Sequence, residues 1–140
     1  MIQYDKFKKA LKHLSLQYEN YTTLEESVST LLKEAVVESV IQRFETCYDC
    51  LWKVLKKYLE YELGVPEVPN SPKPILRIAC ENRLFYSSET QIIAYANARI
   101  GTSHDYSGEK AQDALNLMGD FIKDAIGLYE TMSGESWNDE

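Results

Sequence analysis

Three residues with chemically useful side chains lie close together in the segment Arg99-Ile-Gly-Thr-Ser-His-Asp-Tyr106. A histidine can move a proton near neutral pH, and an arginine can hold a phosphate through two hydrogen bonds. Together they would suffice to cleave RNA by attack of its own 2′-hydroxyl without a metal. A tyrosine hydroxyl beside an arginine could instead accept a nucleotidyl group. The alternative is a capped interhelical loop whose arginine and histidine do no chemistry.

The spacing of this segment predicts that it spans the end of a helix. On a continuous helix, side chains five residues apart point about 140° apart, so Arg99 and His104 would diverge. The intervening Gly101-Thr-Ser103 disfavours an uninterrupted helix. We therefore place Arg99 in a last helical turn, where a cation suits the helix dipole. His104 and Tyr106 would follow on the loop before the final helix, and such a loop can gather the three side chains around one point.

Apolar residues recur at helical spacing, and the strongest run extends from about residue 34 to residue 63. Its predicted core face comprises Val37, Val40, Ile41, Phe44, Cys47, Tyr48, Leu51, Leu55, Tyr58 and Leu59. The residues expected largely on the opposite, solvent face are Glu38, Gln42, Glu45, Asp49, Lys53 and Lys56. Gly64 is expected to stop this helix.

Further helices are predicted along the rest of the chain. They are expected from Tyr4 to Tyr18, Thr22 to Lys33, Pro72 to about Leu84, Glu89 to Ile100, and about Ala111 to Met132. The expected N-caps are Ser71, Ser87 or Ser88, and Ser107. No segment shows strand alternation. The sequence therefore predicts an all-α, up-and-down bundle of four to five helices in a single domain over residues 1–140, with a frayed tail at 134–140.

Composition and charge exclude several classes of function. The net charge of −7 argues against a duplex DNA binder, although lysines cluster locally near residues 6–12 and 53–57. Such clusters are most often solvated faces. No run approaches the ~20 apolar residues of a membrane span, and the lysine-rich start does not resemble a signal peptide, so we expect no membrane association and a cytoplasmic protein. Cys47 and Cys50 lie inside an apolar helical run, which favours core packing and no metal site.

The motif Arg-x4-His-x-Tyr at Arg99, His104 and Tyr106 resembles that of HEPN-domain proteins, in the same place between the penultimate and last helices. The segments Val40-Ile-Gln-Arg-Phe-Glu45 and Leu51-Trp-Lys-Val-Leu-Lys-Lys-Tyr-Leu59 resemble the nucleotidyltransferase substrate-binding branch of that superfamily. A Ser-Pro pair followed by a helix fits the same pattern. The resemblance covers roughly residues 33–132, and residues 1–33 show none. It implies a bundle similar to the helical domain of kanamycin nucleotidyltransferase.

The resemblance also implies a partner, a minimal nucleotidyltransferase chain that lacks such a helical domain and carries ATP and Mg²⁺. No cofactor would be bound by this chain itself. In one account the bundle is the substrate-binding half of a two-chain nucleotidyltransferase. In the other it is a toxin, a metal-independent RNase whose arginine and histidine meet across a homodimer, and the antitoxin partner adenylylates the motif tyrosine. A helical adaptor without an active site is the third possibility.

The resemblance gives each motif residue an expected role. Arg99 would hold phosphate, His104 would act as acid and base or contact a ligand, and Tyr106 would accept AMP. The expected supporting residues are Asp105, Arg43 and Glu45. The net charge of −7 suits the RNase account less well, because an RNA-cleaving enzyme benefits from a positive groove.

Overall fold

Five helices make up the fold in the computed structural model, which describes residues 1–104 and 108–137. They are α1 (Asp5–Thr22), α2 (Thr30–Tyr61), α3 (Pro72–Glu81), α4 (Glu89–Thr102) and α5 (Gly108–Ser133). The described residues contain no strand. The predicted all-α bundle is therefore confirmed.

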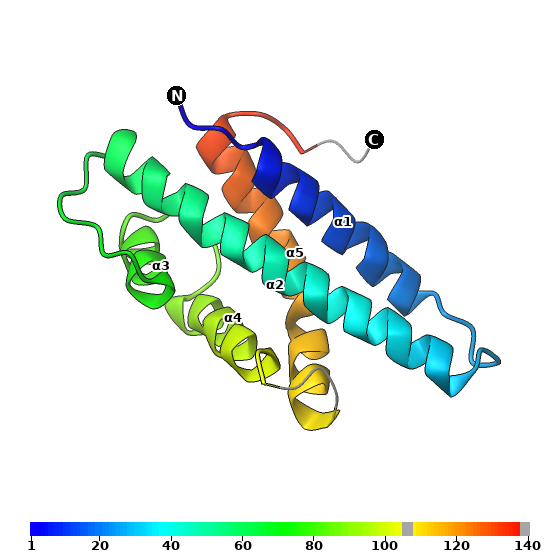
Figure 1. Ribbon diagram of the computed structural model, residues 1–140. Helices are drawn as coiled ribbons and strands as arrows, with labels where there is room; N and C mark the ends of the chain where they lie inside the picture. Colours follow the sequence, from blue (N-terminus) through cyan, green and yellow to red (C-terminus); the bar gives the residue numbers. More distant parts are fainter. Residues whose placement is uncertain (105–107, 138–140) are drawn as a thin grey trace.

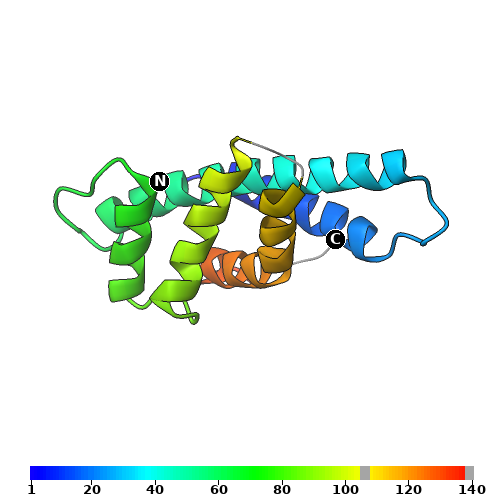
Figure 2. The same ribbon diagram turned by 90° about the horizontal axis from the view of Figure 1, so that it is seen from below.

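The long helix α2 is the centre of the bundle, because it contacts each of the other four helices. Helix α1 runs antiparallel to α2, and α5 packs against both of them (Figure 1). Helices α3 and α4 lie on the other side of α2 and contact each other, as the view from below also shows (Figure 2). The end of α4 is thereby placed beside the middle of α2.

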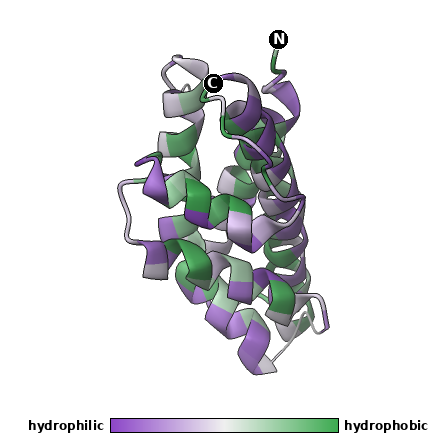
Figure 3. Ribbon diagram, turned by 90° about the vertical axis from the view of Figure 1, so that its left-hand side faces the viewer, coloured by the Kyte–Doolittle hydropathy of each residue, from purple (hydrophilic) through white to green (hydrophobic). Residues whose placement is uncertain are grey.

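The core forms from the predicted apolar face of α2 and matching faces of the other helices. Phe44 and Leu51 are 0% and 3% exposed, which confirms the predicted face, and Cys47 is a fully buried core residue. Burial also raises the pKa of the Cys47 thiol. Each helix carries both hydrophobic and hydrophilic residues (Figure 3), as expected of helices that bury one face and expose the other.

Both ends of α2 differ from the prediction. Residues 23–29 connect α1 to α2, so the helix predicted over Thr22–Lys33 does not exist as a separate element. Instead α2 starts at Thr30, because the Ser29 hydroxyl accepts a hydrogen bond from the Leu32 amide at 3.1 Å. At its other end α2 stops at Tyr61, and Gly64 turns the chain with a positive φ of 66°.

Helix α3 is shorter than predicted and α4 is slightly longer. Helix α3 ends at Glu81, because Arg83 adopts a left-handed φ of 58° that a helix cannot contain. Ser88 caps α4 by accepting a hydrogen bond from the Gln91 amide at 3.2 Å. Ser71 also stands at an N-cap position, but its side chain forms no capping bond within the described residues. The predicted cap Ser107 lies outside the described residues.

These two serines give a matched pair for a stability test. Ser88→Ala should lower the free energy of unfolding by about 1 kcal/mol, because an orphan amide at the start of α4 loses its acceptor. Ser71→Ala should cost clearly less, since its hydroxyl caps nothing among the described residues. Urea denaturation of both variants measures the difference. Equal losses would show that the Ser88 cap does not stabilise the protein.

The part of the tail that is described lies against α5. The Trp137 amide donates to Glu130 Oε2 at 2.8 Å, and the Trp137 ring meets Tyr129 edge-on at 5.6 Å between centroids. This differs from the frayed tail expected for residues 134–140, of which 138–140 lie outside the described residues. Among the described helices, none is long and apolar enough to cross a membrane.

Candidate functional site

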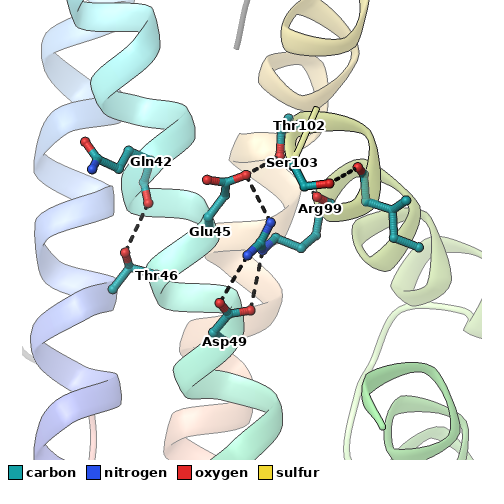
Figure 4. Close-up of polar contacts among 8 residues, drawn as sticks. Gln42, Glu45, Thr46, Asp49, Arg99, Thr102 and Ser103 are labelled. Carbon is teal, nitrogen blue, oxygen red and sulfur yellow. Dashed lines mark hydrogen bonds and ion pairs between the residues drawn. The ribbon is translucent and has the colours of Figure 1, made fainter. Parts of the chain in front are cut away.

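The Arg99 side chain reaches from the last turn of α4 to two carboxylates on α2 (Figure 4). Its Nη1 lies 3.1 Å from Glu45 Oε2. Its Nε and Nη2 donate to the two carboxylate oxygens of Asp49, at 3.4 and 3.2 Å. The position of Arg99 at the helix end was predicted, whereas its engagement with acidic side chains was not.

The periodicity of α2 places both carboxylates opposite Arg99. Glu45 and Asp49 are four residues apart, so they share one face of the helix. Glu45 directly follows Phe44, and Asp49 directly follows Tyr48. Because both aromatic rings are buried in the core, they fix the rotation of α2 about its own axis. The Phe44 ring meets Phe121 of α5 edge-on at 5.0 Å between centroids. The core therefore holds the acidic face of α2 toward α4.

The Glu45 carboxylate is buried, and Arg99 and Thr102 of α4 donate hydrogen bonds to it. It is 8% exposed, although periodicity alone placed it on the solvent face of α2. The fully buried Thr102 hydroxyl donates to Glu45 Oε2 at 2.9 Å, beside the bond from Arg99. A carboxylate can be buried when it is paired with a cation and hydrogen bonded. The site thus has two carboxylates around one guanidinium.

A pocket of about 420 Å³ opens beside this cluster, between α2, α3 and α4. Its apolar wall consists of Tyr48, Trp52, Pro72, Ala96 and Ile100, and its polar lining of Asp49, Ser71, Lys73, Arg99 and Ser103. Burial raises the pKa of the Tyr48 phenol, so this group stays protonated and able to donate a hydrogen bond. Apolar walls with a few convergent polar groups are typical of small-molecule sites.

The structure brings together only some of the predicted site residues. Arg99 and Glu45 meet, whereas Arg43 is exposed on another part of α2 and lines a separate hollow with His13. His104 lies at the exposed turn after α4, where its amide donates to the Gly101 carbonyl at 3.4 Å. No described contact joins the His104 ring to Arg99. Asp105 and Tyr106 lie outside the described residues.

Asp49, Thr102 and Trp52 are among the residues of the site that sequence reasoning missed. The spacing of Glu45 and Asp49 was a usable signal, because two carboxylates at positions i and i+4 mark one acidic helix face. Thr102 gave no signal, since its burial depends on how α4 meets α2. Trp52 belonged to a segment used only for the family resemblance, and its place in the pocket follows from the packing of α3.

Comparison with solved structures shows the same fold in another protein. A crystal structure of a protein from Thermus thermophilus matches with a TM-score of 0.74 and 23% sequence identity. The match covers 91% of this chain and 98% of that one. At this identity the likeness establishes the fold alone. Comparison with curated proteins gave no match.

Comparison with protein-family models gives the family. Residues 2–134 match the family described as nucleotidyltransferase substrate binding protein like. The match includes the first helix, α1, which showed no resemblance in the sequence, and it runs through α5 to the start of the tail. It agrees with the likeness of the Arg99 motif and the α2 segments to the HEPN superfamily. This chain therefore belongs to the family of nucleotidyltransferase substrate-binding-like proteins.

Proposed function

We propose that this chain is the substrate-binding subunit of a two-chain nucleotidyltransferase, and that Tyr106 accepts AMP from the partner. The pocket beside Arg99 supports this proposal, because a hollow with the size and lining expected of a small-molecule site lies next to this residue of the motif. Asp49 and Arg99 present opposite charges at its wall, with side chains 40% and 26% exposed. Such a wall suits a polar substrate that carries both hydrogen-bond donors and acceptors.

The partner would supply ATP and Mg²⁺, and this chain would supply the acceptor. A phenol with a pKa near 10 is a poor nucleophile at neutral pH and needs activation. In the proposed step the Tyr106 oxygen bonds to the α-phosphorus of ATP, the bond to pyrophosphate breaks, and the phenol proton passes to a base. His104, exposed two residues earlier, is our candidate for that base. We expect the chain to act as a homodimer within a hetero-oligomer.

The ribonuclease account ranks second because of the charges around Arg99. A phosphate of RNA would compete there with Glu45 and Asp49, which already accept hydrogen bonds from the guanidinium. Bringing a third anion to this point is opposed by Coulomb repulsion from the two carboxylates. A substrate that needs both donors and acceptors meets no such conflict.

Incubation with the partner nucleotidyltransferase, ATP and Mg²⁺ tests the proposal. We expect intact mass spectrometry to show a gain of one or more AMP units, which Tyr106→Phe abolishes. Tyr86→Phe is the matched control, because Tyr86 is 97% exposed and lies in another connection, between α3 and α4. If an active partner adds no AMP, or adds it equally to Tyr106→Phe, Tyr106 is not the acceptor.

A further inference from the structure

A second hollow lies on the other side of Asp49, in the groove between α1 and α2. Its volume is about 400 Å³, and Asp49 borders both this groove and the pocket beside Arg99. Three lysines line it: Lys6 from α1, and Lys53 and Lys57 from α2. The rest of its lining is Gln3, Phe7, Thr46, Cys50 and Val54. We call this hollow the lysine groove.

The positive charges of the lysine groove have no salt-bridge partner among the described residues. Lys53 and Lys57 are four residues apart on one helix face, an arrangement of like charges that destabilises a helix. In the part of the chain that the structure describes, no carboxylate forms a salt bridge with either of them or with Lys6. The neighbouring Lys56, by contrast, pairs with Glu60 at 3.2 Å.

The one acidic residue among those that line the groove already has a cationic partner. Both carboxylate oxygens of Asp49 accept hydrogen bonds from Arg99 across the α2–α4 contact. Burial raises the pKa of the Cys50 thiol, while the nearby charges of Lys6 and Lys53 lower it and the charge of Asp49 raises it. The groove is thus a local site of positive potential in a chain whose net charge is −7.

We propose that the lysine groove binds phosphate groups, such as those of a nucleotide or of a nucleic-acid strand. Three ammonium groups from two helices can surround one anion, and each can donate a charge-assisted hydrogen bond to it. The bound anion would relieve the repulsion between Lys53 and Lys57. The groove is distinct from the pocket beside Arg99, so this inference depends neither on a partner chain nor on Tyr106.

Binding to the full chain alone tests the proposal, with inorganic triphosphate, ATP and a short single-stranded RNA as probes in calorimetry. We expect at least one probe to bind and its affinity to fall as salt rises. The relative affinities of the three probes distinguish the two sources of phosphate. Equal binding of triphosphate and ATP would indicate that the groove takes free phosphate groups. Tighter binding of the RNA would indicate that it takes a nucleic-acid strand. Lys6→Gln/Lys57→Gln should weaken binding by about tenfold or more, because two charge-assisted bonds are lost.

Lys9→Gln/Lys123→Gln is the matched control. This variant also loses two positive charges, but from exposed positions outside the groove. Its affinity for the probe should therefore stay within about twofold of that of the wild type. Alkylation gives a second, local readout, because Cys50 lines the groove whereas Cys80 lies on α3. A saturating probe should slow modification of Cys50 and leave Cys80 unchanged.

Three outcomes would overturn the proposal. One is that none of the three probes binds. Another is that both double variants weaken binding equally, which would mean that net charge acts and the groove does not. The third is that the groove variant loses only its association with a nucleotidyltransferase chain, which would make the groove a protein-docking surface.

Discussion

Replacing Arg99 by alanine is expected to lower the free energy of unfolding by about 2–4 kcal/mol. The variant leaves Glu45 buried and charged without this cation, while the Thr102 hydroxyl still donates to it. The loss should stay below that of a fully buried pair, because the Arg99 and Asp49 side chains are 26% and 40% exposed. Urea denaturation at neutral pH measures it.

An exposed ion pair of the same kind is the control for this effect. Arg77 Nε lies 3.7 Å from Glu89, and both side chains are more than half exposed. Arg77→Ala should therefore cost no more than about 0.5 kcal/mol, since water screens such a pair. If Arg99→Ala unfolds at the same denaturant concentration as the wild type, the cluster around Glu45 does not stabilise the fold.

The double variant Arg99→Ala/Glu45→Gln separates lost pairing from lost packing. A neutral amide needs no counter-charge and can still accept a hydrogen bond from Thr102. The double variant should therefore recover part of the stability lost by Arg99→Ala. Without such recovery, the cost of Arg99→Ala comes from contacts of its aliphatic stem and not from the charge left on Glu45.

This stability effect changes how functional tests of the motif should be designed. Arg99 has a structural partner on α2, so loss of activity in Arg99→Ala does not by itself assign a role in chemistry. Arg99→Lys keeps the charge but cannot reproduce the two bonds to Asp49. His104 is exposed at the turn after α4, and its replacement should leave the fold intact. His104→Ala is thus the cleaner test of catalysis.

Much of the fold could be predicted because helical periodicity records which face is buried. The spacing of Phe44 and Leu51 identified the core face of α2. The run Gly101-Thr-Ser103 predicted a helix end soon after Arg99, and α4 ends at Thr102, two residues beyond the predicted Ile100. The N-terminal boundary of α2 was missed, since Thr22–Lys33 contains enough apolar residues to resemble a helix. The decisive feature was a single capping hydroxyl, that of Ser29.

The candidate site was harder to predict because its partners come from different helices. Periodicity assigned Glu45 to solvent, as it does for most charged residues on a helix. In the structure Glu45 is buried instead, and Arg99 makes its burial favourable by pairing with it. This pairing depends on how α4 packs against α2, which the sequence of α2 does not indicate. In the same way, Lys53 and Lys57 were visible as a local pair, but Lys6 joins them only through the antiparallel contact of α1 with α2.

Phe44→Ala should be the most destabilising of these substitutions, by about 3–5 kcal/mol. Phe44 is fully buried, and its edge-on partner Phe121 also meets the Tyr95 ring, at 5.2 Å between centroids. Truncation would leave a cavity where α2, α4 and α5 meet, and the surrounding rings can fill it only in part. The lost contacts and the cavity add to the lost burial of apolar surface.

Leu31→Ala on the same helix is the control, because Leu31 is 79% exposed and its truncation should change stability by no more than about 0.5 kcal/mol. A loss in Phe44→Ala no larger than in Leu31→Ala would mean that the assigned core face of α2 is wrong. The same cavity should also disturb the site, because Glu45 follows Phe44 directly on the helix. A milder substitution, Phe44→Leu, should therefore weaken binding of the proposed substrate in the pocket beside Arg99 while the protein remains folded.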